Sequence, residues 1–502
     1  MPDDHPESKA GSRTARFSRQ TWVTLTPALV PAVLMLLVGL VRAGRPTLSW
    51  DEASTADIVR RTPGQIWALI QHVDAVLGPY YFLMHAWSHV AGESETALRL
   101  PSIVAMAAAV GLAGELGRRL FTPAVGLLAG VLLCLVPNTS RYAAEARPYA
   151  FTCLFSVLAV LLLVRALERP RRRRWAAYAG VVVLLGASHL IALSTLVAHG
   201  VAVWAHHRKG AAPRAVKGWV LSLAAAVLVL SPVVLMGVRH RSEQLSWVEF
   251  LTRDTFLLAP GEIFGASNMA WLLIGLAVLA RWRPREPVRL LAVLALAPPV
   301  LVAAASLTVY PLWVPRYLLV ILTPLAILAA VALVGVGGWA TRRGRWGALA
   351  RVGGVVLLLA ITALPGHGRV RSATAKNGPD YRGVAAIIEK RQSPGDVIVF
   401  ETDSRALRAG MDYYLRLSHQ RPTDVLQRRS AADVGELRAA EYAGADAAAR
   451  LTSTSRVWLV VGGDRRDPTA LVPAVQGVLR EKYVVAGLWH RNEATVALYR
   501  AR

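Results

Sequence analysis

The chain has 502 residues, of which 54% are hydrophobic and only 18% are charged, and its mean hydropathy is +0.40. This composition excludes an ordinary soluble domain and predicts a protein that crosses a membrane several times. The net charge of +25 would suggest nucleic acid as a partner of a soluble protein, but in a membrane protein it is first compared with the excess of Lys and Arg in cytoplasmic loops.

Membrane-spanning helices need about 20 mainly apolar residues, and eleven runs of the chain are predicted to form them. The first is longer than the apolar part of a signal peptide and no A-x-A site closes it, so we interpret it as a retained helix. Cys134 and Cys153 lie in such runs, so we expect packed thiols rather than metal ligands or a disulfide framework. The predicted spans are residues 22–43, 102–120, 124–140, 149–165, 175–189, 190–206, 219–237, 269–281, 289–309, 317–340 and 350–366.

Basic residues fall on alternate connections between these spans, and the positive-inside rule places those connections in the cytoplasm. The N-terminus is then cytoplasmic and the C-terminus extracytoplasmic. Much of the positive charge is a topology signal, so no nucleic-acid partner is expected. The polar residues 1–20 are predicted to be disordered. The basic clusters are Lys9, Arg13, Arg16 and Arg19, then Arg118 and Arg119, and residues 165–174, 206–217, 281–289 and 342–351.

The fold predicted from these patterns is a polytopic α-helical membrane bundle over residues 21–366, followed by an extracytoplasmic α/β domain over residues 367–502. The long apolar runs stop after His367, and short β-rich runs then alternate with helical patterns. No GxGxxG follows Gly463, so a docking or stabilising domain is favoured over a nucleotide-binding one. Strands are predicted at residues 394–401, 455–463, 483–490 and 494–500.

Two adjacent carboxylates, Asp51 and Glu52, lie just outside the first span in the sequence SWDEASTADIVRR. An acidic residue that caps a helix N-terminus is the simplest explanation. The rest of the outer connection 44–101 has apolar residues at helical spacing together with aromatic residues, which is typical of helices that lie in the membrane interface. Such helices would hold Asp51 at the depth of a lipid phosphate.

The other outer connections carry single arginines beside tyrosines. Arg141 and Arg147 flank Glu145, and Arg316 opens a span directly after Pro315. Arg and Tyr often extend toward the membrane interface without binding a ligand. Arginines on the translocated side nevertheless oppose the positive-inside bias, which predicts an anionic ligand, and the guanidinium fork can bind two phosphate oxygens at once. For His189, in the turn between the fifth and sixth spans, a structural role is the simpler interpretation.

A carboxylate among separated cations suits a site where arginines bind a lipid phosphate while the carboxylate accepts a proton from a nucleophile. A transporter should instead have interrupted helices and ionisable residues near the middle of the membrane, and Glu115 is the nearest candidate for such a residue. A transporter or flippase, or a non-catalytic partner that binds polyprenyl-linked sugars, is the alternative.

The sequence resembles the GT-C class of integral-membrane glycosyltransferases, in particular bacterial enzymes related to the protein O-mannosyltransferases and the lipid A aminoarabinose transferase. The matching segments follow one another through nearly the whole chain and are specific for the class rather than for a sugar. They are WDE at 50–52, HVDAVLGPYYFLMHAW at 72–87, ALRLPS at 97–102, YAAEARPYA at 142–150, PRYLL at 315–319 and DYRGVAAII at 380–388.

The resemblance implies that a sugar is transferred with inversion from a polyprenyl-phosphate donor on the outer face of the membrane. Asp51 is then expected to be the catalytic base, with Glu52 as its positioning partner. No cofactor is expected, and a divalent ion held by Asp51 and Glu52 is the alternative. The expected phosphate ligands are Arg147, Arg316, Arg141 and Arg99, and the expected pocket residues are Tyr149, His189, Tyr80 and Asp74.

The C-terminal domain departs from the family pattern, because protein O-mannosyltransferases carry a β-trefoil domain at the corresponding side. This difference favours a cell-envelope glycan or lipoglycan over a protein as acceptor. A long basic chain with such a tail is similar to actinobacterial enzymes that use decaprenyl-phosphate mannose or arabinose, so either sugar is expected, at the bacterial plasma membrane. Membrane lipids are the other expected partners.

Overall fold

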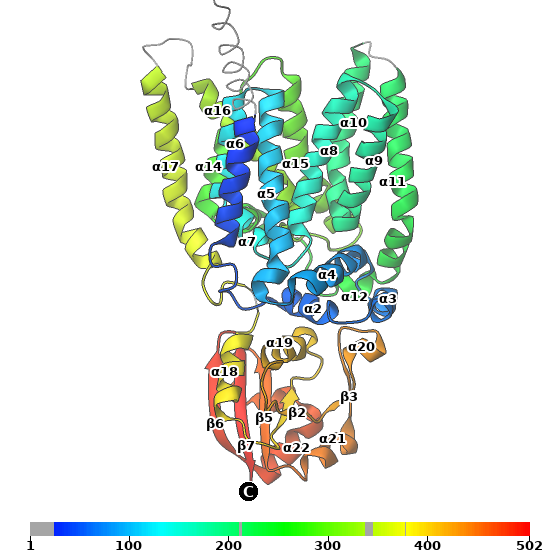
Figure 1. The fold of residues 1–502 in the computed structure, drawn as a ribbon, viewed down its shortest axis with the longest axis vertical. Helices are drawn as coiled ribbons and strands as arrows, with labels where there is room; N and C mark the ends of the chain where they lie inside the picture. Colours follow the sequence, from blue (N-terminus) through cyan, green and yellow to red (C-terminus); the bar gives the residue numbers. More distant parts are fainter. Residues whose placement is uncertain (1–24, 210–212, 337–344, 377) are drawn as a thin grey trace, which may run out of the picture.

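The computed structural model describes residues 25–209, 213–336, 345–376 and 378–502. In this part of the chain a bundle of long helices carries a smaller domain with a β-sheet at one end (Figure 1). The segment 1–20 that we expect to be disordered lies outside the described residues, as do the four N-terminal basic residues and parts of the basic connections 206–217 and 342–351.

All eleven predicted spans are mainly helical where the structure describes them, with non-helical residues such as 41–43, 136 and 280–281. The bundle consists of an apolar helix Leu25–Leu40, α5 (Glu95–Leu120), α6 (Pro123–Leu135), α7 (Pro137–Ala143), α8 (Tyr149–Glu168), α9 (Arg172–Ser188), η2 (Leu190–Thr195), α10 (Leu196–Arg208), α11 (Pro213–Arg239), α12 (Arg241–Leu245), α13 (Arg253–Phe264), α14 (Ser267–Val278), α15 (Glu286–Thr308), η3 (Pro315–Ile321), α16 (Leu322–Val336) and α17 (Arg345–Val370).

The number of helices that can cross a membrane is smaller than the number of predicted spans. Among the described residues, seven helices are long and apolar enough, and two bent pairs raise the number to nine. The pair α6 and α7 bends by 74°, and the pair α13 and α14 bends by 89°. The remaining predicted spans, Leu25–Leu40 and the 17-residue α9, are short. Eleven crossings are therefore reached only if both bent pairs and both short helices cross.

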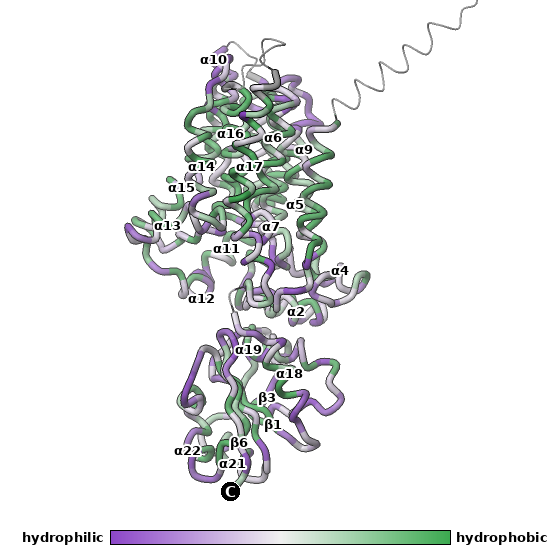
Figure 2. Tube along the Cα trace, turned by 90° about the vertical axis from the view of Figure 1, so that its left-hand side faces the viewer, coloured by the Kyte–Doolittle hydropathy of each residue, from purple (hydrophilic) through white to green (hydrophobic). Residues whose placement is uncertain are grey.

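The bundle presents apolar side chains to its surroundings, as a bilayer requires. Val227 and Leu228 on α11 are 68% and 75% exposed, and Leu357 on α17 is 61% exposed. Figure 2 shows apolar residues along the bundle helices, with hydrophilic residues at the ends of the bundle and over the C-terminal domain. The chain is thus a multi-pass membrane protein.

The basic ends of several bundle helices lie at the end of the bundle away from the C-terminal domain (Figure 1). Helices α5 and α8 begin at the end near the domain, and their basic residues Arg118, Arg119 and Arg165 lie in their last turns. Helix α9 begins with Arg172 at that distant end and returns toward the domain. The alternation of basic connections in the sequence therefore corresponds to a separation of charge in space.

The long connection 44–101 forms short helices across the end of the bundle that faces the domain (Figure 1). These are α2 (Trp50–Ile58), α3 (Pro63–His72), η1 (Ala75–Leu77) and α4 (Gly78–Ala91). Helix α2 starts at a capping box, in which the Ser49 hydroxyl accepts from the Glu52 N–H and the Glu52 carboxylate accepts from the Ser49 N–H. The connection is helical, and its position in the membrane interface stays a prediction.

The C-terminal domain is a mixed sheet with helices, as predicted. All four predicted strands are present, whereas β2 and the β3–β4 pair are too short for the sequence pattern to indicate. The sheet order is β2-β1-β5-β7-β6, with β1 parallel to β2 and β5 and with β7 antiparallel to β5 and β6. The elements are α18 (Tyr381–Arg391), β1 (Val397–Phe400), α19 (Arg405–Leu415), β2 (Thr423–Asp424), β3 (Gln427–Arg429), α20 (Ala431–Val434), β4 (Ala440–Glu441), α21 (Gly444–Leu451), β5 (Arg456–Gly462), η5 (Pro468–Leu471), α22 (Pro473–Lys482), β6 (Tyr483–Arg491) and β7 (Ala494–Ala501).

The domain is fixed to the bundle through α18 and α19. The Tyr413 hydroxyl donates to the Glu93 carbonyl oxygen at 2.7 Å, and Arg382 pairs with Glu95 at 2.6 Å. Helix α19 also packs on α2, and Ala53 of α2 belongs to the apolar core of the domain. The helix that carries Asp51 is thus held between the two parts of the molecule.

Candidate active site

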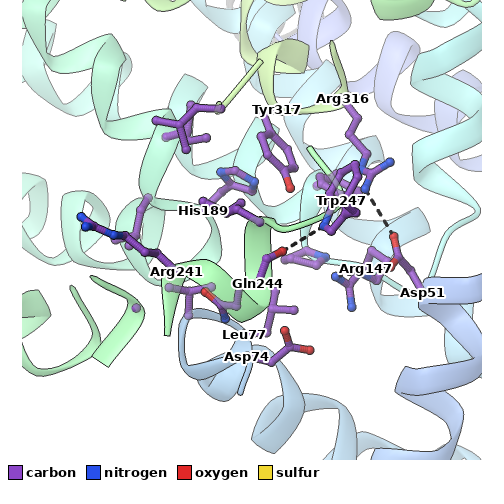
Figure 3. Close-up of a pocket in the computed structure, with 18 of the residues that line it drawn as sticks. Asp51, Asp74, Leu77, Arg147, His189, Arg241, Gln244, Trp247, Arg316 and Tyr317 are labelled. Atoms are coloured by element: carbon purple, nitrogen blue, oxygen red, sulfur yellow. Dashed lines mark hydrogen bonds and ion pairs between the residues drawn. The ribbon is translucent and has the colours of Figure 1, made fainter. Parts of the chain in front are cut away.

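A cavity of about 530 Å³ lies where α2, the bundle and the C-terminal domain meet (Figure 3). Its polar wall includes Asp51, Arg147 and Arg316, which come from three distant parts of the sequence. Apolar side chains of the bundle form much of the remaining wall, namely Leu190, Ile191, Val234, Val238, Leu245 and Leu312. Arg405, Ala406 and Leu437 close it from the C-terminal domain.

Asp51 and Glu52 point in different directions although they are adjacent. Successive side chains on an α-helix are about 100° apart, so one step along α2 changes the surface that a residue faces. The Asp51 side chain is 37% exposed and lines the cavity, whereas the Glu52 side chain is 0% exposed. The two carboxylates therefore have separate environments and do not form one paired site.

Two arginines face the Asp51 carboxylate. Arg147 Nη2 lies 4.0 Å from Asp51 Oδ1, and Arg316 Nη2 lies 3.8 Å from Asp51 Oδ2. Both distances exceed those of hydrogen bonds, so charge attraction holds the three groups together without locking them. Nε of each arginine is buried and has no hydrogen-bond partner within the described ranges. The Nη2 atoms, at 3.8 and 4.0 Å from Asp51, are the donors that an anion in the cavity could approach.

Aromatic rings set the orientation of Arg316. Its guanidinium carbon lies 4.9 Å from the centre of the Trp247 ring and 5.7 Å from that of Tyr317. Trp247 Nε1 in turn donates to the Gln244 carbonyl oxygen at 2.9 Å. From the sequence, Trp247 is only one aromatic residue in a long outer connection, and neither Gln244 nor Arg241 is indicated. Figure 3 places all three around the cavity.

Asp74, Tyr149 and His189, which we expect in the pocket, also line the cavity. Asp74 has a positive φ of 56°, in the left-handed region, which Asp adopts more readily than most non-glycine residues. The Tyr81 hydroxyl donates to Asp74 Oδ2 at 2.7 Å, which fixes the carboxylate. The centroid of the His189 ring lies 4.4 Å from the centroid of the Tyr317 ring and 6.2 Å from that of the Tyr149 ring.

Arg99, Glu52 and Tyr80 are not part of the cavity wall. Arg99 is fully buried, and its guanidinium donates to Glu52 at 2.8 and 2.9 Å and to the carbonyl oxygens of Ala43, Pro46 and Thr47. These bonds use the donors of the Arg99 guanidinium. The sequence led us to expect Arg99 to bind a phosphate, but in the structure it does not face the cavity. Tyr80 is 4% exposed and packs beside Phe151.

Glu52 is charged despite its burial. Burial alone would raise the pKa of this carboxyl, but Arg99 and Lys376 hold the pKa well below its usual range. Lys376 Nζ lies 2.6 Å from Glu52 Oε1, and the Ala146 N–H donates to the same oxygen at 2.9 Å. Because these groups occupy the Glu52 oxygens, Glu52 does not offer a second carboxylate to an ion bound at Asp51. In the described part of the chain no group of three or more His, Cys, Asp or Glu could hold a metal ion.

Arg141 lines a second cavity, of about 360 Å³, on another side of Arg316. Glu262 and Arg369 also contribute to its wall, and Arg141 Nε lies 3.8 Å from the buried Glu145. The structure thus separates Arg141 from Asp51 and Arg147, although Arg316 lines both cavities.

Comparisons with known proteins agree with this architecture. Residues 79–236, about a third of the chain, match the family model described as dolichyl-phosphate-mannose-protein mannosyltransferase. Comparison with curated proteins finds no match.

Solved structures match over nearly the full chain at low sequence identity. ArnT from Cupriavidus metallidurans in the apo state is 15% identical with a TM-score of 0.58, over 96% of this chain and 98% of that one. The same protein bound to undecaprenyl phosphate is 14% identical with a TM-score of 0.57, over 93% and 97%. The oligosaccharyltransferase of Archaeoglobus fulgidus is 10% identical with a TM-score of 0.51, over 94% and 74%.

The fold of the chain is that of the GT-C class. The family match and the fold together indicate a glycosyltransferase of this class, related to the protein O-mannosyltransferases and the aminoarabinose transferase.

Proposed function

We propose that the protein is an inverting glycosyltransferase that moves a sugar from a polyprenyl-phosphate donor to a hydroxyl group of a cell-envelope glycan, lipoglycan or protein. The observation that carries this proposal is the position of Asp51 between Arg147 and Arg316 in a cavity with a largely apolar wall. The ArnT structure with bound undecaprenyl phosphate supports a lipid-linked donor for this fold.

The donor phosphate would bind Arg147 and Arg316. Both can present two N–H groups to phosphate oxygens, and their partly buried setting strengthens charge-assisted hydrogen bonds. Burial opposes the charge of Arg147, yet the nearby Asp51 carboxylate raises its pKa well above the ordinary value, so this cation persists at all physiological pH values. The apolar wall from Leu190 to Leu312 suits the isoprenoid chain.

Asp51 would accept the proton of the acceptor hydroxyl. The acceptor oxygen forms a bond to the anomeric carbon while the bond from that carbon to the phosphate oxygen breaks. The electron pair of the broken bond remains on the polyprenyl phosphate, where the two arginines stabilise the increasing negative charge. The proton moves to an Asp51 oxygen, and attack from the face opposite the leaving group inverts the anomeric centre.

The orientation that fits this reaction puts the cavity and the C-terminal domain outside the cytoplasm. The basic ends of α5, α8 and α9 lie at the far end of the bundle, and the positive-inside rule assigns that end to the cytoplasm. Mannose and arabinose are the sugars that we favour, because the matched family is described by a mannosyl donor and the sequence is similar to actinobacterial enzymes that use either sugar.

Mass spectrometry of the lipids that co-purify with the protein tests this proposal. We expect Asp51→Asn to retain a polyprenyl phosphate that carries one hexose or one pentose, because the donor still binds but transfer stops. Arg316→Ala should retain less of this lipid. Asp446→Asn, which changes an exposed carboxylate on α21, is the matched control and should behave as wild type.

Each negative outcome has a defined meaning. Bulk phospholipid alone in every variant would show that the arginines do not bind the proposed donor. Bound donor together with unchanged transfer by Asp51→Asn would remove Asp51 as the base. Bound donor without transfer by the wild type would favour a flippase or a non-catalytic partner.

A further inference from the structure

The connector between α17 and the C-terminal domain has buried residues, Arg371, Lys376 and Gly378, that lie against the elements supplying the candidate active site. Arg371 donates to the carbonyl oxygens of Val38 and Ser140 at 2.9 and 3.1 Å, and the Thr47 N–H donates to the Ala373 carbonyl oxygen at 3.0 Å. At Gly378 the backbone has a φ of 135°, and an added Cβ would lie 3.2 Å from the backbone nitrogen of Trp50. The connector is therefore packed directly against the start of the helix that carries Asp51.

Lys376 of this connector belongs to a buried cluster with an unbalanced charge. The side chains of Glu52, Arg99 and Lys376 are 0%, 0% and 2% exposed. Arg99 binds both oxygens of Glu52, so the ammonium of Lys376 shares this carboxylate with a guanidinium, and the buried Glu145 carboxylate adds only a more distant negative charge. Burial of an ion that shares its counterion is costly. A stabilising role could be met at lower cost by an apolar side chain, so the charge of Lys376 points to another role.

The contacts of Lys376 connect the two segments that supply the active site. Its Nζ donates to the Ala144 carbonyl oxygen and to Glu52 Oε1, both at 2.6 Å. Glu52 follows Asp51 on α2. The Ala146 N–H, directly before Arg147, donates to the same Glu52 oxygen at 2.9 Å. One ammonium group thus joins the helix of Asp51 to the loop of Arg147.

We propose that Lys376 is a positioning residue that, through Glu52 and Ala144, sets the distance between Asp51 and Arg147, so that transfer requires the connector to be in place. This inference rests on the proposed function of Asp51 and Arg147. Lys376 does not touch the substrate. Its contribution is the fixed geometry of two groups that do, and a displacement of about 1 Å in such groups can cost about a hundredfold in rate.

Titration of Lys376 gives this role a pH dependence. Burial and the charge of Arg99 lower the pKa of Lys376 to about 8, while Glu52 and Glu145 oppose the shift. Above this pH the ammonium loses its proton, and the charge-assisted bonds to Glu52 and Ala144 weaken. The folded pKa is lower than that of an unfolded lysine, about 10.4, so between these values the unfolded chain binds more protons and the folding stability contributed by Lys376 rises with pH. Activity and stability should therefore change in opposite directions.

The test compares Lys376→Met, Lys376→Arg and the exposed-site control Lys390→Met in the full-length protein. Synthetic polyprenyl-phosphate mannose and polyprenyl-phosphate arabinose serve as donors, and an envelope glycan extract serves as acceptor. We expect Lys376→Met to lower kcat by about a hundredfold, with the KM for donor changed less than about threefold and the unfolding midpoint not lowered. Wild-type kcat should fall above about pH 8 while the protein stays folded, and Lys376→Arg, which does not titrate in this range, should move that fall to higher pH.

The outcomes separate this inference from the proposed function. Absence of transfer by the wild type with either donor would overturn the proposed function, and this inference with it. Transfer by the wild type together with wild-type kcat in Lys376→Met, or a loss that appears only in KM, would overturn the role of Lys376 alone. If Lys376→Met fails to fold, the pH dependence of kcat in Lys376→Arg tests the inference instead. A fall in kcat at the same alkaline pH as in the wild type would refute it.

Discussion

One residue step on α2 separates a carboxylate that lines the cavity from one that is buried. Asp51 faces the cavity, where two guanidinium groups at 3.8 and 4.0 Å leave room for a ligand. Glu52 is surrounded by Arg99, Lys376 and backbone N–H groups. Charge alone does not distinguish these two residues. Their access to solvent does.

Substitution of the two acids by amides should therefore give opposite phenotypes. Asp51→Asn should fold normally, with no transfer detectable. Glu52→Gln leaves two buried cations without a carboxylate, so we expect a loss of stability of about 3–5 kcal/mol. Thermal unfolding of both variants in detergent measures the contrast. Equal unfolding midpoints for the two variants would contradict this assignment of roles.

The sequence predicts site residues whose position at the membrane surface needs an explanation. Arg147 and Arg316 could be found because they oppose the positive-inside bias, and Asp51 because it belongs to an acidic pair beside a span that the family resemblance also includes; all three line one cavity. Arg99 is likewise a single arginine on an outer connection. Its partner Glu52 is 47 residues away in the sequence, so only the fold reveals their pairing. Trp247 could not be predicted, because cation stacking depends on three-dimensional proximity.

At the scale of helices, α5 and α6 cross at glycines. An added Cβ at Gly126 would lie 2.2 Å from the Gly114 carbonyl oxygen, and one at Gly114 would lie 1.9 Å from the Pro27 carbonyl oxygen. Small residues at such crossings allow membrane helices to gain close backbone contact. This contact orders the N-terminal helix, α5 and α6, and α5 carries Arg99.

Alanine at the crossing should destabilise the protein, whereas alanine at an open position should not. Gly126→Ala forces the backbones apart, with an expected cost of about 1–3 kcal/mol. Gly180→Ala on α9 is the matched control, because no heavy atom lies within 4 Å of its added Cβ and alanine favours a helix by about 1 kcal/mol. Thermal unfolding midpoints of the two variants measure this difference. A midpoint of Gly126→Ala at or above that of Gly180→Ala would contradict the close crossing of the helices.

Hydropathy predicts where helices form better than where they bend. Each apolar run became helical, but the 74° bend between α6 and α7 was not apparent from composition. Pro137, which opens α7, lacks the N–H that would continue the α6 hydrogen bonds. In the C-terminal domain, the four longer strands could be predicted from β-branched runs, whereas β2 and β4 have two residues each and depend on their neighbours.

At the scale of the molecule, charge is distributed along the axis of the bundle. The arginine-rich helix ends lie opposite the C-terminal domain, and the cavity lies on the domain side (Figure 1). A membrane potential and anionic inner-leaflet lipids both favour the orientation with the arginines in the cytoplasm.

Cysteine labelling in intact cells checks this orientation. Cys134 and Cys153 are buried, so the wild type gives a low background. Gln420→Cys in the C-terminal domain and Arg173→Cys at the opposite end are both at exposed positions. A membrane-impermeant maleimide should label Gln420→Cys in intact cells and label Arg173→Cys only after permeabilisation. The reverse pattern would place the domain in the cytoplasm.

The closure of the cavity by Arg405, Ala406 and Leu437 has a consequence for how such proteins diversify. The apolar wall comes from the bundle, and the remaining wall comes from a segment near the end of the chain. If the proposed function holds, recombination that exchanges this segment alters which acceptor enters while the residues proposed for donor binding are inherited unchanged. Any successful chimera would have to keep Arg371 and Lys376 together with their partners in the bundle, and keep the α19 surface that packs on α2, so the junction is best placed after Lys376.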